Sequence, residues 1–475
     1  MGRPRSIGQE GGQLLRERWA YSWAFSVISP RNPARWCCVP PAFIRTRCFA
    51  LTRPSISMTQ INVNSEIGPL RRVIVHRPDS GIARVSPRLA EELLFDDIVH
   101  LPKMQEEHDT FTRVLKAFIG DDNVLEAEQL LCEALAASEE TRDWLIDRAV
   151  DYEELPEAYR ERLRALTDEE LTQVMISGHW QAEDRYIFDP IPNFIFTRDI
   201  AVTINDHVLI TRAGKEARFR ENFLIRTIIH AHPIFKTVHA GNRIINLNLP
   251  DKFAPGRMRE PVSMEGGDVM ILNKDYLLIG CSERTNAHTI HLLRDYLFEH
   301  GVVKNVAQIN IPKDRSCMHI DTIFTQINNR HVVAYKPLVI NGLSSNVEVH
   351  RSNGVSTFYH SIADFLRSEI NPEMEFIEAG DGMSPYQERE QWTDGCNLVA
   401  LRPGIALTYD RNPVTERAFK EAGYDILHAD QLLSDLAAEK YKVADLQNTI
   451  ITLPSSELSR ARGGSHCMTC PVERA

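Results

Sequence analysis

Residues 462–471 read Arg-Gly-Gly-Ser-His-Cys-Met-Thr-Cys-Pro, and we expect the rest of the chain to fold around this loop. The pair Gly463-Gly464 lets the backbone turn tightly and approach a ligand closely. Cys467 follows at once, as a nucleophile would if upstream residues assemble a site around it. From this stretch alone two other interpretations stay open: a free surface thiol, or one half of a zinc-binding or redox Cys-x-x-Cys pair with Cys470.

The composition is that of a globular protein. The chain has 475 residues, of which 43% are hydrophobic and 25% charged, and its length allows two or three domains. A net charge of -11 predicts repulsion of nucleic acids and anionic membranes. No apolar run reaches the roughly 18 to 20 residues that cross a bilayer. The nine cysteines follow no regular spacing, which is typical of a reducing compartment, so we expect a cytoplasmic protein without nucleic-acid or membrane partners.

Residues 1–57 differ from the rest of the chain. They contain nine arginines, no lysine and two acids, a balance of +7, which leaves -18 for residues 58–475. An Arg-rich, acid-poor targeting peptide is one interpretation. We favour another, that the start codon is assigned too far upstream and translation begins at Met58. The segment is therefore predicted to be disordered or not translated.

Beyond this leader, the sequence predicts an α/β fold. Apolar residues recur at helical spacing between Met104 and Ile176, which predicts a helical module at 104–177. The segments 58–103 and 178–475 are predicted to form the catalytic domain, because strand and helix patterns alternate there. The expected strands are 73–75, 194–196, 208–210, 277–279, 332–335 and 405–407, and the expected helices are 219–231, 286–300, 362–368 and 414–422.

Two polar stretches in the α/β part place charges beside apolar residues. Asn193 and Asp199 are expected at opposite ends of the apolar strand 194–196, where Asp199 would either bind a cation or cap a turn. Glu265-Gly-Gly-Asp268 places two glycines between two acids just before a predicted strand. This spacing is unusual for a plain turn, so it suggests contact with a ligand or a metal.

A third polar stretch holds His319 and Asp321. If these residues lie in a strand, positions i and i+2 project from the same face, and the two side chains point together. Such a pair is either catalytic or a buried, mutually satisfied contact. Carboxylates match a planar guanidinium with paired hydrogen bonds, and a cysteine can attack its central carbon. Three carboxylates, one histidine and one cysteine therefore suit chemistry on a guanidinium group.

These stretches together resemble the arginine deiminases, which belong to the guanidino-modifying enzymes alongside the amidinotransferases. The motifs that carry the resemblance are Asn-x-x-Phe-Thr-Arg-Asp (193–199), Glu-Gly-Gly-Asp (265–268), His-x-Asp-Thr (319–322) and Gly-Gly-x-His-Cys-Met-Thr-Cys-Pro (463–471). They occur in the family's order between Met58 and the C-terminus. The resemblance implies a five-bladed, pseudo-symmetric ββαβ propeller around a central polar site, with a helical insert after the first module.

The resemblance also implies roles for individual residues. Cys467 would be the nucleophile and His319 the general acid that protonates leaving ammonia. Asp199 and Asp321 would bind the guanidinium, and Glu265 would assist at the same group. The reaction implied is hydrolysis of L-arginine to L-citrulline and ammonia through a covalent Cys-thiouronium, without a metal or an organic cofactor. The family commonly associates, so a homo-oligomer is expected.

A second set of residues is implied to hold the rest of the substrate. Arg218 and Arg284, together with Asn193, would bind the substrate carboxylate. Arg462 and the segment 93–97 would lie on loops that close the site. The sequence departs from the family at Ser465 and Ala461, where the family commonly has glycine, and this affects the expected motion of the loop more than its chemistry.

Two alternatives to arginine hydrolysis remain at this stage. An amidinotransferase, or a deiminase of another guanidino compound such as agmatine, would use the same steps up to the thiouronium. A non-enzymatic zinc-binding protein would use Cys317, His319, Cys467 and Cys470. The sequence offers no second Cys pair at the spacing of structural zinc sites, which argues against that function.

Overall fold

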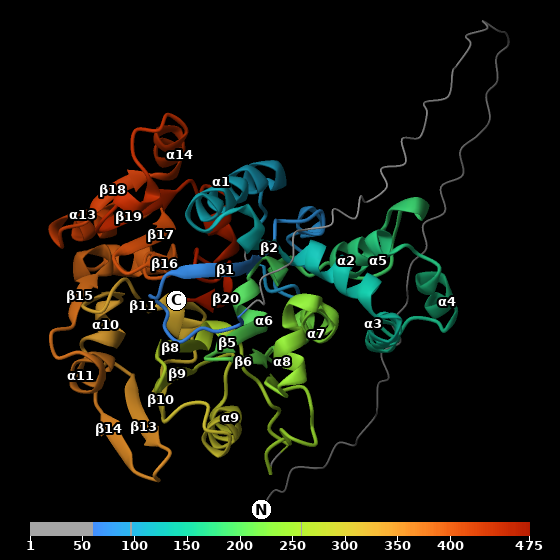
Figure 1. The fold of residues 1–475 in the computed structure, drawn as a ribbon, viewed down its shortest axis with the longest axis horizontal. Coiled ribbons are helices and arrows are strands. Elements are labelled where there is room, and N and C mark those ends of the chain that lie inside the picture. The colour runs from blue at the N-terminus through green and yellow to red at the C-terminus, as the bar shows by residue number, and fades with distance from the viewer. Residues whose placement is uncertain (1–59, 96, 258) are drawn as a thin grey trace, which may run out of the picture. The chain divides into compact units, whose positions relative to one another are not determined.

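The computed structural model describes residues 60–95, 97–257 and 259–475. The predicted leader, residues 1–57, and the proposed start at Met58 lie outside the described residues. In the described part, strands alternate with helices along most of the chain, so the protein belongs to the predicted α/β class (Figure 1). None of the described helices is long and apolar enough to cross a membrane.

Five sheets share one arrangement of three strands. In each, a middle strand pairs antiparallel with an inner strand and parallel with a third strand. Written as inner, middle and third strand, the sheets are β20–β1–β2 (Cys470–Arg474, Leu70–Val75, Val124–Glu126), β5–β6–β7 (Ala201–Ile204, His207–Ile210, Ile244–Asn246), β8–β9–β10 (Val269–Asn273, Tyr276–Cys281, Asn305–Asn310), β11–β12–β15 (Phe324–Gln326, His331–Ala334, Glu375–Glu378) and β16–β17–β19 (Val399–Arg402, Ile405–Tyr409, Thr449–Leu453). The inner strands are almost entirely buried.

Three of these sheets involve further strands or distant parts of the chain. The third is extended by β13 (Asn346–Arg351) and β14 (Ser356–Tyr359), and the fifth by β18 (Asp425–His428). The first joins the two ends of the described chain, because β20 pairs with β1. A short separate hairpin is formed by β3 (His179–Trp180) and β4 (Arg185–Tyr186).

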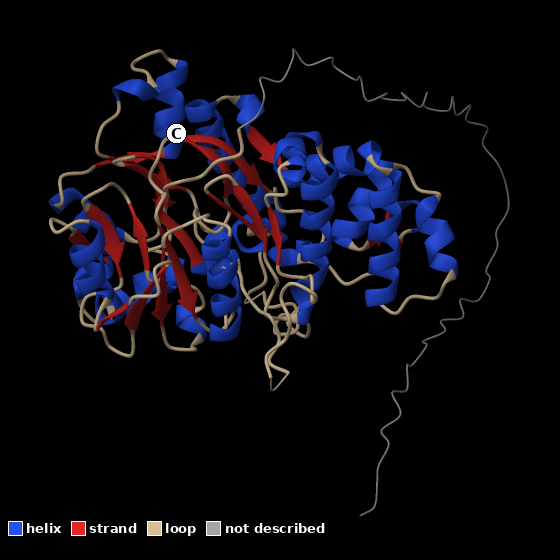
Figure 2. Ribbon diagram, turned by 60° about the horizontal axis from the view of Figure 1, so that its bottom comes forward, coloured by secondary structure: helices blue, strands red, loops and turns tan. Residues whose placement is uncertain are grey.

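A helical connection leads from each middle strand to the parallel strand beside it, because two parallel neighbours need a crossover. Figure 2 shows the strands in the interior and helices around them. The helices of the five crossovers are α1 (Leu101–Ile119), α7 and α8 (Phe219–Ala231, Lys236–Ala240), α9 (Ala287–Glu299), α10 and α11 (Lys336–Val339, Ile362–Phe365), and α13 and α14 (Pro413–Glu421, Ala429–Ala437). The predicted helix 219–231 has the bounds of α7, and the predicted helices 286–300 and 414–422 agree with α9 and α13 within a residue at each end.

Five hydrophobic cores link the sheets in sequence. One core contains residues of the first and second sheets, another those of the second and third, and two more join the third to the fourth and the fourth to the fifth. The last core joins the fifth sheet back to the first: Val399 and Leu407 belong to the same cluster as Val73 and Val75. The sheets therefore contact one another in a ring, with the inner strands buried.

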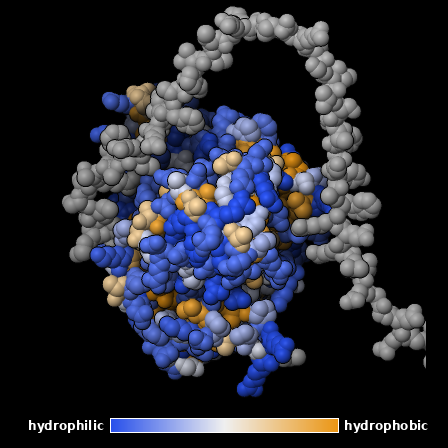
Figure 3. Space-filling model, turned by 90° about the vertical axis from the view of Figure 1, so that its right-hand side faces the viewer, coloured by the Kyte–Doolittle hydropathy of each residue, from blue (hydrophilic) through white to orange (hydrophobic). Residues whose placement is uncertain are grey.

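The predicted helical module contains α2 (Ala127–Ala137), α3 (Glu139–Tyr152), α4 (Ala158–Arg164) and α5 (Asp168–Ser177). α2 and α3 pack on α7, and the predicted capping box of α5 is present between Thr167 and Glu170. The range 104–177 also includes most of α1, which packs on α14, and β2, which pairs with β1. The face on the side of α3 and α4 is largely hydrophilic (Figure 3).

Two predicted strands are wrong. Residues 192–195 form a 3-10 turn, and α6 (Thr197–Ile200) follows directly, so Asn193 and Asp199 do not lie at the ends of a strand. Ile320–Thr322 is also a 3-10 turn, with His319 as the residue before it. The buried apolar residues in these turns resemble a strand in sequence, because a short apolar run does not distinguish the two. The predicted strands 73–75, 208–210, 277–279, 332–335 and 405–407 correspond to β1, β6, β9, β12 and β17.

Candidate active site

The predicted site residues lie in short turns that immediately precede inner strands. Asp199 lies in α6 before β5, and Glu265 precedes a 3-10 turn before β8. His319 directly precedes the 3-10 turn before β11, and Asp321 lies within that turn. Cys467 lies in the turn before β20. These turns contact one another, and the side chains of all five residues are almost completely buried.

Cys467 lies between one acceptor and one donor. Its Sγ is 3.4 Å from Oδ2 of Asp321 and 3.1 Å from Nδ2 of Asn397. Burial raises the pKa of the Cys467 thiol well above its usual value, and the carboxylates of Asp321, Asp199 and Asp394 raise it further. The sulfur is therefore protonated in this arrangement, and a cation placed among these carboxylates would favour the thiolate.

His319 faces two carboxylates. Its Nε2 is 2.9 Å from Oε2 of Glu265, and its Nδ1 is 3.7 Å from Oδ1 of Asp199. Burial alone would lower the pKa of His319, but Asp199, Glu265 and Asp268 outweigh burial and raise it to about 10. The imidazole is thus protonated at neutral pH and can donate a proton.

The prediction that His319 and Asp321 point together from one strand face is wrong. His319 reaches Glu265, whereas Oδ2 of Asp321 accepts a hydrogen bond from the ring of His466 at 2.9 Å and faces Cys467. The backbone enters the 3-10 turn directly after His319, so the two side chains point in different directions, yet both reach the same cluster. Burial opposes ionisation of Asp321, but His466, His319 and the hydrogen bond from Cys467 together outweigh burial and lower the pKa of Asp321.

Arg218 lies among the acids of the site. Its guanidinium contacts Oδ2 of Asp199 at 2.7 Å and Oε2 of Glu265 at 3.3 Å, and it pairs with both carboxylate oxygens of Glu221. A guanidinium thus already occupies the carboxylates that were predicted to bind the guanidinium of a substrate. Burial opposes the charge of Arg218, but Glu221, Asp199 and Glu265 outweigh burial and raise its pKa.

Gly267 explains part of the Glu-Gly-Gly-Asp motif. A Cβ at this position would lie 2.5 Å from Nδ1 of His319 and 3.1 Å from Oδ1 of Asp199. The Gly267 amide donates a hydrogen bond to that same Asp199 oxygen at 3.2 Å. Only glycine lets the backbone hold Asp199 while His319 packs directly on it.

The remaining predicted residues lie around a narrow cavity of about 20 Å³. Its lining comprises Leu94, Asn193, Phe196, Asp199, Arg218, Arg284, Arg315, Met318, His319, Thr322, Ala461, Arg462 and Cys467. Arg284 is buried, lies 3.7 Å from Glu265, and its Nε has no hydrogen-bond partner among the described residues. Such a donor suits an anionic group on a ligand.

Two loops at this cavity were predicted to close the site. Asn193 donates a hydrogen bond of 2.7 Å to the carbonyl of Leu93, which ties the segment 93–97 to the site, although Asp96 lies outside the described residues. The guanidinium of Arg462 stacks on the ring of Trp392 at 3.3 Å from its centroid. Arg462 adopts a left-handed backbone conformation with φ of 61°. Both loops therefore contact the cavity.

A metal ion is one chemical alternative for this cluster. One ligand atom each of Asp199, Glu265 and His319 lies within 4.8 Å of the others. However, Arg218 contacts both acids, and His319 carries a proton where a metal would need a neutral ring nitrogen. The donor set therefore suits a planar cation better than a metal ion.

The sequence analysis missed three residues of this site. Arg315 lines the cavity, Asn397 contacts Sγ of Cys467, and the buried Asp394 contributes to the charge around it. Asp394-Gly-Cys-Asn397 stands just before β16, as the other polar turns stand before their inner strands. This repeated position before an inner strand was the signal in the sequence that could have found Asp394 and Asn397.

The chain is similar in sequence to proteins described as arginine deiminases. The family described as "Arginine deiminase" matches residues 91–183 and 164–474. A protein named arginine deiminase from Listeria monocytogenes serotype 4b (strain CLIP80459) is 34% identical over 443 residues, covering 87% of this chain and 98% of that protein. An arginine deiminase of Listeria innocua serovar 6a is 33% identical with the same coverage.

Solved structures give more distant similarities. A point mutant of DDAH from Pseudomonas aeruginosa in complex with citrulline aligns with a TM-score of 0.44 at 14% identity, over 85% of this chain and 99% of that one. SxtG, an amidinotransferase from Microseira wollei, aligns with a TM-score of 0.49 at 13% identity, over 87% and 97% of the two chains.

Proposed function

This chain belongs to the arginine deiminase family, and from that membership we propose that the cluster around Cys467 is where it hydrolyses L-arginine to L-citrulline and ammonia. The observation that carries the proposal is the convergence of Cys467, His319, Asp199, Asp321 and Glu265 in one buried cluster. The enzyme acts on a carbon–nitrogen bond of the guanidino group, and each of these side chains has a place in that chemistry.

Cys467 is the nucleophile of the proposal. At rest the sulfur is a thiol, because burial and the surrounding carboxylates raise its pKa. An arginine guanidinium bound beside Asp199 and Asp321 brings a positive charge next to the sulfur and favours release of the thiol proton to solvent. The thiolate then forms a bond to the guanidinium carbon and gives a tetrahedral adduct.

His319 is the general acid and later the general base. Its raised pKa keeps the ring protonated, so it donates a proton to the departing nitrogen of the adduct. The C–N bond breaks, ammonia leaves, and a Cys467 S-alkylthiouronium remains. The neutral ring then takes a proton from water, and the water oxygen attacks the same carbon. The C–S bond breaks, the hydroxyl proton of this adduct passes to the sulfur, and citrulline leaves with the Cys467 thiol restored.

In the proposal, the guanidinium of the substrate binds by replacing the guanidinium of Arg218. Arg218 contacts Asp199 and Glu265, and the cavity beside them has room for about one water molecule. A substrate guanidinium therefore replaces that of Arg218, which stays paired with Glu221 and turns toward the substrate carboxylate. Arg284 and Asn193, which line the same cavity, bind this carboxylate with it.

The mouth of the site completes the substrate-binding proposal. Arg462 is proposed to move from the ring of Trp392 toward bound substrate, and the segment 93–97 to close beside it. Ser465 donates a hydrogen bond of 2.6 Å to the carbonyl of Leu407, and Ala461 lines the cavity. These contacts restrain the loop where the family commonly has glycine, so they are expected to affect the rate of loop motion.

We also propose that the five sheets are the blades of a propeller with the site on its axis. The shared strand order and the ring of five cores support this architecture. Residues 58–103 and 178–475 form the catalytic domain of the proposal, and 104–177 the helical insertion. Homo-oligomeric assembly and a cytoplasmic location stay predictions, which light scattering of the purified protein and fractionation of its host would test.

The test of the proposed site is the change Cys467→Ser. Citrulline formation should fall below detection while arginine still binds by calorimetry. Acid quenching of the parent enzyme during turnover should trap an adduct on the peptide that contains Cys467, and the variant should yield none. Cys281→Ser, in β9, is the matched control, because Cys281 does not line the cavity, and it should keep parental activity.

Three outcomes would point elsewhere. Undiminished turnover by Cys467→Ser would remove the nucleophile assignment. A panel of guanidines with and without an acceptor amine distinguishes hydrolysis from transfer: a new guanidino product that forms only with the amine present, at the expense of citrulline, would indicate an amidinotransferase. A preference for agmatine over arginine would contradict the carboxylate-binding role of Arg218 and Arg284.

A further inference from the structure

Five polar turns precede the five inner strands. The turn before β16 is the one to which the proposed reaction assigns no role. The turns before β5, β8, β11 and β20 each supply a residue to the site. The corresponding turn before β16 ends at Asn397, a side chain with no exposed surface. Asn397 therefore has a position equivalent to that of the site residues in the other four turns.

The amide of Asn397 holds Cys467 at two points. Its Nδ2 donates to Sγ of Cys467 at 3.1 Å, and its Oδ1 accepts the Cys467 backbone N–H at 3.2 Å. The same Nδ2 also donates to the carbonyl of Asp321 at 3.2 Å. One planar group therefore fixes both the backbone and the sulfur of the proposed nucleophile.

These partners leave one orientation for the amide. If Oδ1 and Nδ2 were exchanged, the NH₂ group would face the Cys467 N–H, and the oxygen would face the carbonyl oxygen of Asp321. Two donors would then oppose each other on one side and two acceptors on the other, and both contacts would be lost. The donor therefore faces the sulfur.

The N–H of Asn397 has the opposite effect on the thiolate from the carboxylates around the sulfur. Asp321, Asp199 and Asp394 all disfavour a thiolate at this place. Among the described contacts of Sγ, that with Asp321 is to an acceptor, and the N–H of Asn397 is the one that stabilises a negatively charged sulfur. Hydrogen bonds to charged groups are stronger than those to neutral ones, so the contact gains strength when the thiol loses its proton.

We propose that Asn397 is a positioning residue for the reaction, which orients the sulfur of Cys467 and donates a hydrogen bond to it when the thiolate forms. The inference rests on the proposed role of Cys467 as nucleophile. Asn397 acts through Cys467, and the described structure records no contact between its side chain and Arg218, Arg284 or Arg462.

Gly464 makes this contact possible. A Cβ there would lie 2.4 Å from the carbonyl oxygen of Asn397 and 2.5 Å from its Oδ1. The loop can reach the Asn397 amide because position 464 has no side chain. The loop thus requires glycine at position 464 because the Asn397 amide contacts Cys467 from there.

The test is Asn397→Asp, which preserves shape but replaces the donor with an oxygen. In the absence of arginine, alkylation of Cys467 by iodoacetamide at fixed pH, followed by mass spectrometry of its peptide, should slow by about 10-fold or more. The value of kcat should fall by about 10- to 100-fold. The dissociation constant of arginine, measured in the Cys467→Ser background, should change by less than about 3-fold, because binding is not lost.

Controls separate this role from a structural one. Asn310→Asp alters a half-buried amide in β10 and should leave alkylation and kcat unchanged. If Asn397→Asp does not fold, Asn397→Ala carries the test, with the same expected losses. Parental alkylation and kcat in a folded variant would overturn the proposal, and so would a weakening of arginine binding as large as the loss in kcat/KM. Turnover by Cys467→Ser would instead refute the proposed nucleophile.

Discussion

The change Gly267→Ala tests whether His319 must pack directly on the backbone of the Glu-Gly-Gly-Asp turn. The added Cβ would lie 2.5 Å from Nδ1 and 2.8 Å from Cγ of His319, whereas ordinary contacts begin near 3.4 Å. The imidazole must therefore retreat by about 0.9 Å, because the glycine itself is held by its hydrogen bond to Asp199. The perturbation moves the proposed acid without removing it.

The size of the effect follows from that displacement. A misplacement of about 1 Å in a catalytic group costs on the order of 100-fold in rate, so kcat should fall by about that factor. Inserting a methyl group into a packed region costs about 1 to 3 kcal/mol of unfolding free energy, which a protein of ordinary stability tolerates. KM should change less than kcat, because Oδ1 of Asp199 would lie 3.1 Å from the new Cβ and need shift by only about 0.3 Å.

The assay is steady-state formation of citrulline, with urea unfolding of the same preparation to confirm the folded state. A single-turnover experiment should show slower release of ammonia as well, because His319 acts in both half-reactions. Gly256→Ala is the matched control, since its Cβ would lie 3.1 Å from the side chain of Glu260 and 3.6 Å from that of His288, neither of which is a predicted site residue. A folded Gly267→Ala enzyme with kcat within about 3-fold of the parent would refute the reasoning.

Three further predictions concern the charges of the site and the core. Arg218→Met leaves Glu221 and its neighbours without their buried cation and should lower the free energy of unfolding by about 3 to 5 kcal/mol in urea titrations; an unchanged midpoint would contradict the described ion pairs. Asp199→Asn should reduce kcat/KM by about 100-fold or more in initial-rate measurements, and an unaltered value would remove this carboxylate from the site. His76 and His319 both have a folded-state pKa of about 10 against an ordinary 6.5, so their stabilisation is complete below pH 6.5 and is lost as the pH rises toward 10. The melting temperature should therefore decline over that range, and His76→Gln should make the decline shallower; identical slopes would contradict the assignment.

The regular parts of the fold follow from sequence because their signals are local. The helix at 219–231 and the strands at 208–210 and 277–279 carry the periodicity of an element with one or both faces buried. The strand β2, by contrast, has three half-buried residues and exists because β1 lies beside it, 51 positions earlier at Val73 and Val124. A pairing of this kind has no local pattern, so the sequence analysis assigned the region to helix.

The prediction of strands at the short turns of the site was wrong for a related reason. Phe194 and Ile195 are buried in a 3-10 turn rather than a strand, since cores on both sides of the turn accept their side chains. The motif residues nevertheless lie together as predicted, because identity at a few positions survives an error in local structure. Asn397 carried no motif of its own, and only its place before an inner strand marks it.

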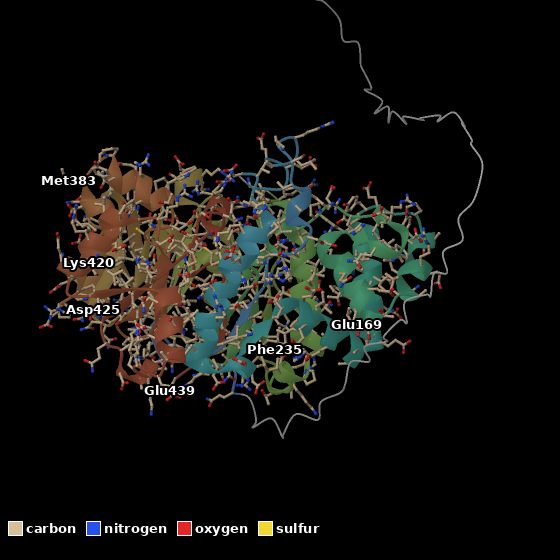
Figure 4. All side chains as sticks on the ribbon, turned by 90° about the horizontal axis from the view of Figure 1, so that it is seen from above. Glu169, Phe235, Met383, Lys420, Asp425 and Glu439 are labelled. Atoms are coloured by element: carbon tan, nitrogen blue, oxygen red, sulfur yellow. The ribbon has the colours of Figure 1, made fainter. Side chains whose placement is uncertain are left out.

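The outermost faces show how little of the chain takes part in this chemistry. Lys420 in α13 and Asp425 in β18 lie on the opposite side of the molecule from Glu169 in the helical module (Figure 4). These exposed positions pair locally or face solvent, and substitutions there are expected to change the free energy of unfolding by about 0.5 kcal/mol or less.

The pairing of β20 with β1 has a consequence for how activity arises during folding. Ile74 and Cys470 are partners across almost four hundred positions, and the reactive sulfur lies three residues before the second of them. Closing so long a loop is entropically costly and slow compared with forming local helices. A chain that has formed most of its helices can therefore still have the Cys467 thiol far from the acids of the site. Activity should appear only after β20 has paired with β1.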